Sequence, residues 1–162
     1  PASAGLVPAM SEHLIGVMSD THGSVRPDVN GAFEGVEMIL HAGDIGGAQI
    51  LSGLKSIAQV TVVRGNTDNE GYARSIPRTQ TIQIGDVLVH MQHSLDYFDM
   101  DPAKAGIGVV VFGHTHRPTN EVRDGALFLN PGSVSRPRGS PASVALLRIT
   151  DSGPAAEIRA LE

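Results

Sequence analysis

Short polar clusters with the donor atoms of a metal site recur along this chain. They consist of Asp, His and Asn side chains and offer no sulfur ligand, because the sequence contains no cysteine. The clusters are Asp20-Thr21-His22, Gly43-Asp44, Gly65-Asn66-Thr67-Asp68, Gln92-His93 and Gly113-His114-Thr115-His116. Oxygen and imidazole nitrogen suit divalent cations such as Mn²⁺, Fe²⁺ or Zn²⁺. Two such ions about 3.5–4 Å apart can hold both the attacking and the leaving oxygen of an in-line displacement.

Each cluster follows a short apolar run that predicts a β-strand. Runs at 14–18, 38–40 and 59–63 alternate with helical stretches at 27–34 and 50–54, a β-α-β-α-β order typical of a parallel sheet. Beyond them, turn signals at 85–86, 123–125 and 151–154 predict three hairpins, and 109–112 predicts a buried strand, so the second half should be mostly antiparallel. Ligands of open α/β sheets bind at the carboxyl ends of strands, where we expect these clusters to meet.

The order of the motifs resembles that of the calcineurin-like metallophosphoesterase family, in its small bacterial and archaeal phosphodiesterase branch. The shared pattern is D-x-H, GD, GN, a lone His and GHxH, and it extends from Leu14 to about Arg138. The segment 130–133, Asn-Pro-Gly-Ser, also matches small family members. The resemblance implies an α/β fold, namely a four-layer αββα sandwich of two mixed β-sheets flanked by helices, with metals at one edge.

The resemblance also implies the ligands of two divalent metal ions, with Mn expected and Fe, Zn, Ni or Co as alternatives. Asp44 would bridge the two ions. The other ligands would be Asp20, His22 and His116 in one site and Asn66, His93 and His114 in the other. The nucleophile would be a hydroxide held between the metals, with Asp44 and Asn66 as catalytic residues. Asp68 is a further candidate catalytic residue from its position in the same loop, and a loop cap is the alternative.

Two positions depart from the family pattern. Where the family shows a His-Gly pair, this chain has His90-Met91 and His93-Ser94. We favour His93 as the ligand, because a strand of ordinary length starting after the turn at 85–86 would end there. Larger members carry a histidine after the GN asparagine, whereas this chain has Thr67. The source of the leaving-group proton is then open, and the candidates are Asp68, a metal-bound water and the substrate itself.

Three further residues are expected beside the metals. His41 precedes Gly43-Asp44 and is predicted to orient ligands through hydrogen bonds rather than to bind metal. Arg64 and Arg136 are predicted to bind substrate phosphate, since guanidinium groups can donate two parallel hydrogen bonds to it. Surface charge is the alternative for both.

Length and composition restrict the classes of protein to which this chain can belong. The 162 residues suit one domain, predicted at 13–162 after a disordered tail at 1–12 in which Met10 is a candidate start. No apolar stretch approaches the roughly 20 residues that cross a bilayer, so we expect no membrane contact, and the absence of cysteine fits a cytoplasmic protein. The formal charge of −5 and the absence of a basic run argue against long nucleic acid as a partner.

The sequence therefore predicts a metal-dependent hydrolase acting on a small phosphodiester, with a phosphomonoester as second choice. A homo-oligomer is compatible with it. One alternative is a protein-binding scaffold of the same fold, like the retromer subunit, in which metal ligands are incomplete. All ligand types are present here, which favours an enzyme. The other alternative is a nuclease, although such relatives are longer and carry extra DNA-binding regions.

Overall fold

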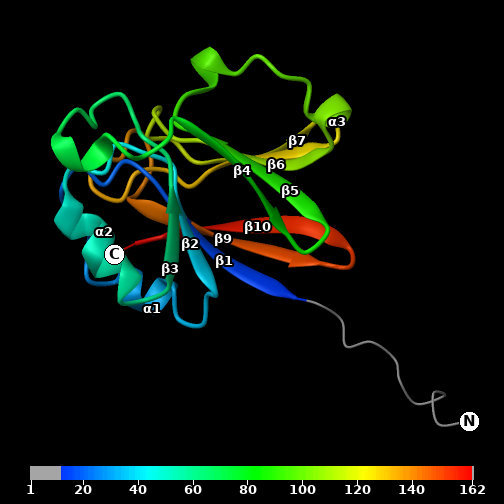
Figure 1. The fold of residues 1–162 in the computed structure, drawn as a ribbon. Helices are drawn as coiled ribbons and strands as arrows, with labels where there is room; N and C mark the ends of the chain where they lie inside the picture. The colour runs from blue at the N-terminus through cyan, green and yellow to red at the C-terminus, as the bar shows by residue number, and fades with distance from the viewer. Residues whose placement is uncertain (1–11, 162) are drawn as a thin grey trace, which may run out of the picture.

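The apolar runs of the chain form two five-stranded β-sheets in the structure, a computed structural model that describes residues 12–161 (Figure 1). The first sheet has the order β10-β9-β1-β2-β3, with β1 (His13–Met18), β2 (Met38–His41), β3 (Gln59–Val62), β9 (Ser143–Thr150) and β10 (Gly153–Ala160). The second has the order β4-β5-β6-β8-β7, with β4 (Thr79–Ile84), β5 (Val87–Gln92), β6 (Ile107–Val111), β7 (Thr119–Arg123) and β8 (Ala126–Asn130). Both sheets are mixed.

Strand pairing follows the sequence prediction except in the centre of the second sheet. β1, β2 and β3 are parallel, and the hairpins β4–β5, β7–β8 and β9–β10 are antiparallel. However, β5 pairs with β6, and β6 with β8, in parallel. The second half is thus mostly antiparallel, as expected, but its two central pairs are parallel. A crossover through residues 93–106 returns the chain to the same end of the sheet, which a tight turn cannot do.

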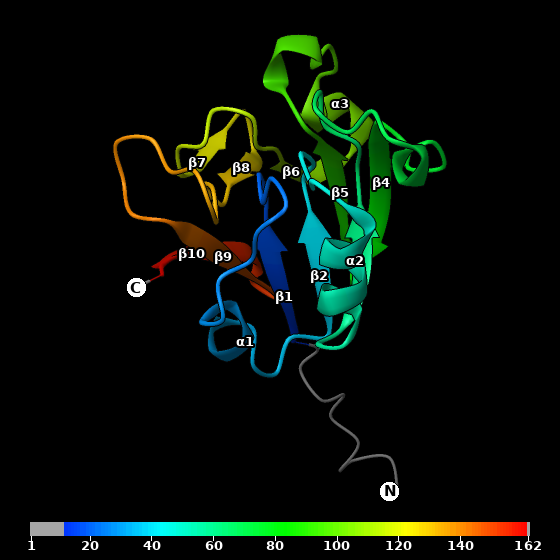
Figure 2. The ribbon, with the colours of Figure 1, turned by 90° about the vertical axis from the view of Figure 1, so that its left-hand side faces the viewer.

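The inner faces of the two sheets form the main core, which contains the fully buried Val17, Leu40, Val89 and Val109. On the outer face of the first sheet lie α1 (Val29–Ala32) and α2 (Ala48–Lys55), which Figure 2 shows beside β1 and β2. The outer face of the second sheet is covered by a thin layer made of η3 (Leu95–Tyr97), α3 (Pro102–Ala105) and the chain between them. This confirms the predicted four-layer arrangement.

The two helices differ from their predicted bounds in opposite directions. α2 extends beyond the predicted 50–54 at both ends, whereas the helix expected over 27–34 is limited to α1, which contains two poor helix formers, Asn30 and Gly31. A single 3₁₀ turn, η2 (Gly71–Ala73), precedes β4. Within residues 12–161 no helix is long and apolar enough to span a membrane. Apart from Glu12, the predicted tail lies outside the described residues.

Candidate metal centre

The loops that carry the predicted ligands have an unusual backbone. Non-glycine residues seldom adopt a positive φ because Cβ then crowds the following carbonyl, and such conformations gather at functional sites. Within residues 12–161, the only non-glycine residue with a positive φ outside these loops is Asp124, in the β7–β8 turn. The others are all predicted ligands: Asp20 (54°), His22 (46°), Asp44 (57°), His114 (73°) and His116 (62°).

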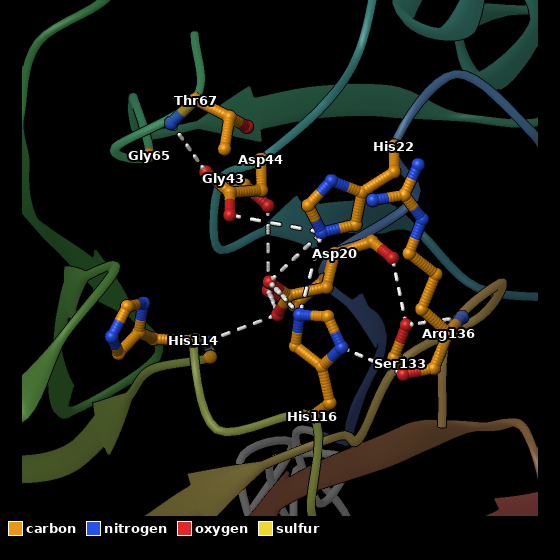
Figure 3. Close-up of polar contacts among 12 residues, drawn as sticks. Asp20, His22, Gly43, Asp44, Gly65, Thr67, His114, His116, Ser133 and Arg136 are labelled. Atoms are coloured by element: carbon orange, nitrogen blue, oxygen red, sulfur yellow. Dashed lines mark hydrogen bonds and ion pairs between the residues drawn. The ribbon is translucent and has the colours of Figure 1, made fainter. Parts of the chain in front are cut away.

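Five predicted ligands converge at the carboxyl ends of β1, β2, β5 and β6, and Figure 3 shows four of them labelled. We call them the acidic–histidine cluster, defined as Asp20, His22, Asp44, His93 and His116. Asp20 Oδ1 lies 3.2 Å from His116 Nε2 and 3.8 Å from His93 Nε2. Asp44 Oδ2 lies 3.2 Å from His93 Nε2 and 3.7 Å from His22 Nε2. The Nε2 atoms of His22 and His116 are 3.3 Å apart.

Backbone carbonyls set the tautomers of two of these histidines. His93 Nδ1 is 2.7 Å from the carbonyl of Ala42, and His116 Nδ1 is 2.6 Å from that of Arg136. A carbonyl only accepts, so each Nδ1 donates its proton there. In the neutral rings, the Nε2 lone pairs then face the cluster, as metal coordination requires.

The electrostatics of the cluster favour a cation. Asp20 and Asp44 are 0% and 2% exposed, although two buried carboxylates repel each other. Burial raises the pKa of Asp44, but its contacts with His93 and the Thr67 N–H outweigh burial and hold that pKa below the usual range. Burial lowers the pKa of His93, yet Asp44 and Asp20 raise it more strongly. For His22 burial dominates, so its pKa is lowered.

Two atoms of the cluster that could bind a metal ion also lack a hydrogen bond. Asp20 Oδ1 and His93 Nε2 are buried and have no hydrogen-bond partner of good geometry among the described residues. Buried polar atoms are nearly always paired, and a divalent cation would satisfy both. Two sets of three ligand atoms, each set within 4.8 Å, could hold one: Asp20, His22 and His116, and Asp20, Asp44 and His93. Asp20 is shared by the two sets, and Asp44 Oδ2 also lies near a histidine of each.

Asn66 and His114 lie beside the cluster and contact each other. His114 Nδ1 is 3.1 Å from Asn66 Oδ1, and the His114 ring packs edge-on against His93 at 5.2 Å. Figure 3 shows the His114 ring apart from His22 and His116. Asn66 and His114 line both cavities that adjoin the cluster. These two predicted ligands are therefore close to the other five, but they bond to each other.

His90 points away from the cluster. It is buried, lies 2.8 Å from Thr81 Oγ1 and 2.9 Å from Gln92 Oε1, and packs against Phe98 on the outer face of the second sheet. Since His93 faces the cluster instead, the geometry favours His93 as the candidate ligand from this strand.

His41 connects two ligand loops without touching a carboxylate of the cluster. Its Nδ1 accepts the Gly43 N–H at 3.1 Å, so Nε2 carries the proton toward Thr21 Oγ1 at 3.0 Å. Thr21 donates in turn to the Ile45 carbonyl at 2.6 Å. Burial lowers the pKa of His41 to about 4, which keeps the ring neutral. The contacts agree with the predicted orienting role.

Asp68 bonds to the backbone of the loops that carry predicted ligands. It is 2% exposed, and both of its oxygens are engaged. They accept hydrogen bonds from the backbone N–H groups of Asp44, Ile45, Gly46 and Gly65 and from the hydroxyl of Tyr72. These contacts join the loops that carry Asp44 and Asn66, as the loop-cap alternative requires, and the catalytic role of Asp68 stays a prediction.

The segment 130–135 supports the cluster, and no role in the site was predicted for it from the sequence. Ser133 Oγ donates to the Asp20 carbonyl at 2.8 Å, and Ser135 Oγ to that of Thr21 at 2.8 Å. Asn130 Nδ2 donates to the Gly113 carbonyl at 3.1 Å, ahead of the two histidines. Ser19, also missed, donates to Asp20 Oδ2 at 2.6 Å. The Asn-Pro-Gly-Ser match was the available signal for this segment.

Two cavities flank the cluster, and each contains one of the arginines predicted to bind phosphate. The arginine cavity, of about 640 Å³, is lined by Arg64 together with Asn66, His93 and His114. The second cavity, of about 470 Å³, is lined by Arg136 with Arg138, His22, Asp44 and His116, among others. Both volumes fall within the usual range for small-ligand sites. The structure thus places Arg64 and Arg136 in different cavities beside the candidate metal centre.

Close packing makes the glycine of the GN motif necessary. A Cβ on Gly65 would lie 2.9 Å from Asp44 Cγ and closer still to Asp44 Oδ1. We expect Gly65→Ala to displace Asp44 and to weaken metal binding by about 10- to 100-fold, the usual effect of disturbing the groups that orient a ligand. Titration calorimetry with Mn²⁺ would measure this. Gly71→Ala is the matched control, since nothing lies within 4 Å of its Cβ position. Equal affinities for the two variants would contradict the prediction.

Comparisons with known proteins agree with the fold and the motifs. Residues 14–152 match the model of the calcineurin-like phosphoesterase superfamily domain. A probable metallophosphoesterase of Methanothermobacter thermautotrophicus is 37% identical over 90% of this chain and 91% of its own length. A phosphodiesterase of Methanocaldococcus jannaschii is 28% identical over 73% of this chain and 82% of its own. Vacuolar protein sorting 29 from Cryptosporidium parvum has the same fold, with a TM-score of 0.73 and 18% identity over 91% of this chain and 97% of its own.

The fold and the site define a metallophosphoesterase domain. This chain belongs to the calcineurin-like phosphoesterase superfamily.

Proposed function

We propose that this chain is a two-metal phosphodiesterase. The observation that carries the proposal is the acidic–histidine cluster, in which the buried atoms Asp20 Oδ1 and His93 Nε2 have no hydrogen-bond partner among residues 12–161. Asp20, His22 and His116 would hold one ion. Asn66, His93 and His114 would hold the other, with Asp44 between the two. The donor set, nitrogen and oxygen without sulfur, suits Mn²⁺ or a neighbouring transition metal.

The chain's own residues would orient the ligands and the substrate. When bound, the ions would polarise a water molecule and offset the charge on the phosphate oxygens. The carbonyls of Ala42 and Arg136 keep two imidazoles in the ligating tautomer, and the Thr67 N–H holds Asp44 Oδ1 at 3.0 Å. The guanidinium group of Arg136 would bind the reacting phosphate, and that of Arg64 would bind a substrate phosphate in the arginine cavity.

The two cavities favour a diester over a monoester. A phosphodiester carries two ester arms, and one cavity opens on each side of Asn66 and His114, which line both. Each cavity can therefore take one arm while the phosphate lies at the cluster. A monoester would fill only one of them.

Metal stoichiometry tests the proposal together with activity. We expect metal-stripped protein to take up about two equivalents of Mn²⁺ with the ligand sets described. The reloaded protein should hydrolyse bis(4-nitrophenyl) phosphate faster than 4-nitrophenyl phosphate. Calorimetry measures the first result and release of nitrophenolate the second.

A protein-binding scaffold is the competing function. Less than one equivalent of bound metal, with no hydrolysis on adding Mn²⁺, would reject the phosphodiesterase and favour that role. Activity confined to single-stranded DNA or RNA would instead indicate a nuclease. The acidic–histidine cluster, which retains all five side chains in contact, supports the enzyme.

A further inference from the structure

The arginine cavity contains a second basic residue, Arg78, that the catalytic scheme does not use. Arg78 lies just before β4, and Arg64 lies just after β3. The Arg64 N–H donates to the carbonyl of Pro77 at 2.8 Å, which places Arg78 next to Arg64 along the cavity wall. Two cationic side chains from different segments therefore line one side of the same cavity.

These arginines have no anionic partner within residues 12–161. The arginines that form ion pairs there are Arg26, Arg123, Arg148 and Arg159, all outside the cavity. In addition, Arg64 Nε is buried and has no hydrogen-bond partner among the described residues. An unsatisfied buried donor is costly, and two positive charges that line one cavity repel each other. An anion bound between them would relieve both penalties.

The remaining lining residues leave a net positive charge. Among the described residues, Asp96 is the one carboxylate that lines the cavity, and it is exposed. Tyr97 also lines it, with 84% of its surface exposed, and offers a flat ring for the body of a substrate arm. This local excess of positive charge lies in a chain of formal charge −5.

We propose that Arg64 and Arg78 form a second anion site, so that the preferred substrate is a phosphodiester with a further phosphate or carboxylate on one arm. This inference rests on the proposed phosphodiesterase function, because His93, His114 and Asn66 at the other end of the cavity belong to the candidate metal centre. The reacting phosphate would lie at the cluster, and the second anion at the arginine pair.

Matched substrates test the second anion site. The probes are the 4-nitrophenyl ester of thymidine 5′-phosphate and the same compound with a 3′-phosphate. Since hydrogen bonds between charged groups are strong, we expect the Mn²⁺-loaded protein to favour the 3′-phosphorylated compound by about 10-fold or more in kcat/KM. Arg78→Ala should bring the ratio of the two kcat/KM values close to one. Arg74→Ala, an exposed arginine outside both cavities, should keep the wild-type ratio.

The outcomes separate this inference from the proposed function. Equal hydrolysis of both probes, or a ratio unchanged by Arg78→Ala, would overturn the second anion site and leave the phosphodiesterase standing. A ratio lost in Arg138→Ala but kept in Arg78→Ala would place the anion in the other cavity, which also overturns it. If neither probe is cleaved, the proposed function fails. Calorimetry then tests the anion site without hydrolysis. The wild type should bind thymidine 3′,5′-bisphosphate more tightly than thymidine 5′-monophosphate, and Arg78→Ala should bind the two equally.

Discussion

Asp44→Asn is expected to lower kcat/KM for bis(4-nitrophenyl) phosphate by several orders of magnitude while the fold is retained. Asn has the same shape, and its Oδ1 can still accept the Thr67 N–H that Asp44 accepts at 3.0 Å. However, a neutral amide cannot supply the charge that two cations share, so both metal sites should weaken together. Nitrophenolate release and Mn²⁺ calorimetry would measure the two effects.

A matched carboxylate outside the cluster serves as the control. Asp86→Asn changes an exposed residue in the β4–β5 turn and should leave both the rate and the metal content unchanged. Near-normal hydrolysis by Asp44→Asn would show that Asp44 does not bridge the ions. Asp20 would then be the candidate, because its Oδ1 is shared by both sets of ligand atoms.

The strands were predictable where a local signal marks both of their ends. β4 and β5 meet at the predicted turn, because Gly85-Asp86 separates two runs of alternating or continuous apolar residues. The parallel β5–β6 pairing was not predictable in this way. It depends on how residues 93–106 cross the outer face of the second sheet, where Phe98 packs against Phe128. That contact joins residues far apart in the sequence.

The candidate site was predictable to the extent that its residues lie directly after strands. His93 could be preferred to His90 because the strand bounds placed it at the sheet edge, where the structure has it beside Asp44. Arg78 gave no comparable signal. It lies near Arg64 only through the backbone bond between Arg64 and Pro77, which no local pattern indicates.

The position of Asp68 was also not predictable from the sequence, because its partners are mostly backbone groups from distant parts of the chain. Its carboxylate bonds to N–H groups in the loop that follows β2 and in the loop that follows β3. The sequence shows only an acid close to a predicted ligand, which is equally consistent with proton transfer. The Tyr72 hydroxyl donates to the same carboxylate at 2.9 Å. Burial is the larger cause and this hydrogen bond the second cause that raise the pKa of Tyr72 to about 12. We therefore propose that Asp68 positions Asp44 through the hydrogen bond to its backbone N–H and does not act on the substrate.

Asp68→Asn is accordingly expected to act on stability first. The amide would turn an NH₂ group toward backbone N–H donors that now share a carboxylate, leaving buried donors unpaired. We expect the free energy of unfolding of the metal-free protein to fall by about 3 kcal/mol. For a chain of this size that is a decrease in Tm of about 6–12 °C. Urea and thermal denaturation would measure both values.

Tyr72→Phe is a milder change with which Asp68→Asn can be compared, because it removes one hydrogen-bond donor to Asp68 and keeps the carboxylate. It should cost about 1 kcal/mol, the usual net value of one hydrogen bond, and leave the bonds from Asp44 and Gly65 intact. A positioning role requires Asp68→Asn to lose stability and Mn²⁺ affinity together, with the rate falling in proportion to metal content. If Asp68→Asn matched the wild type in Tm and in bound metal but failed to cleave bis(4-nitrophenyl) phosphate, Asp68 would instead take part in the reaction itself. The carboxylate would then have to leave the backbone amides during turnover.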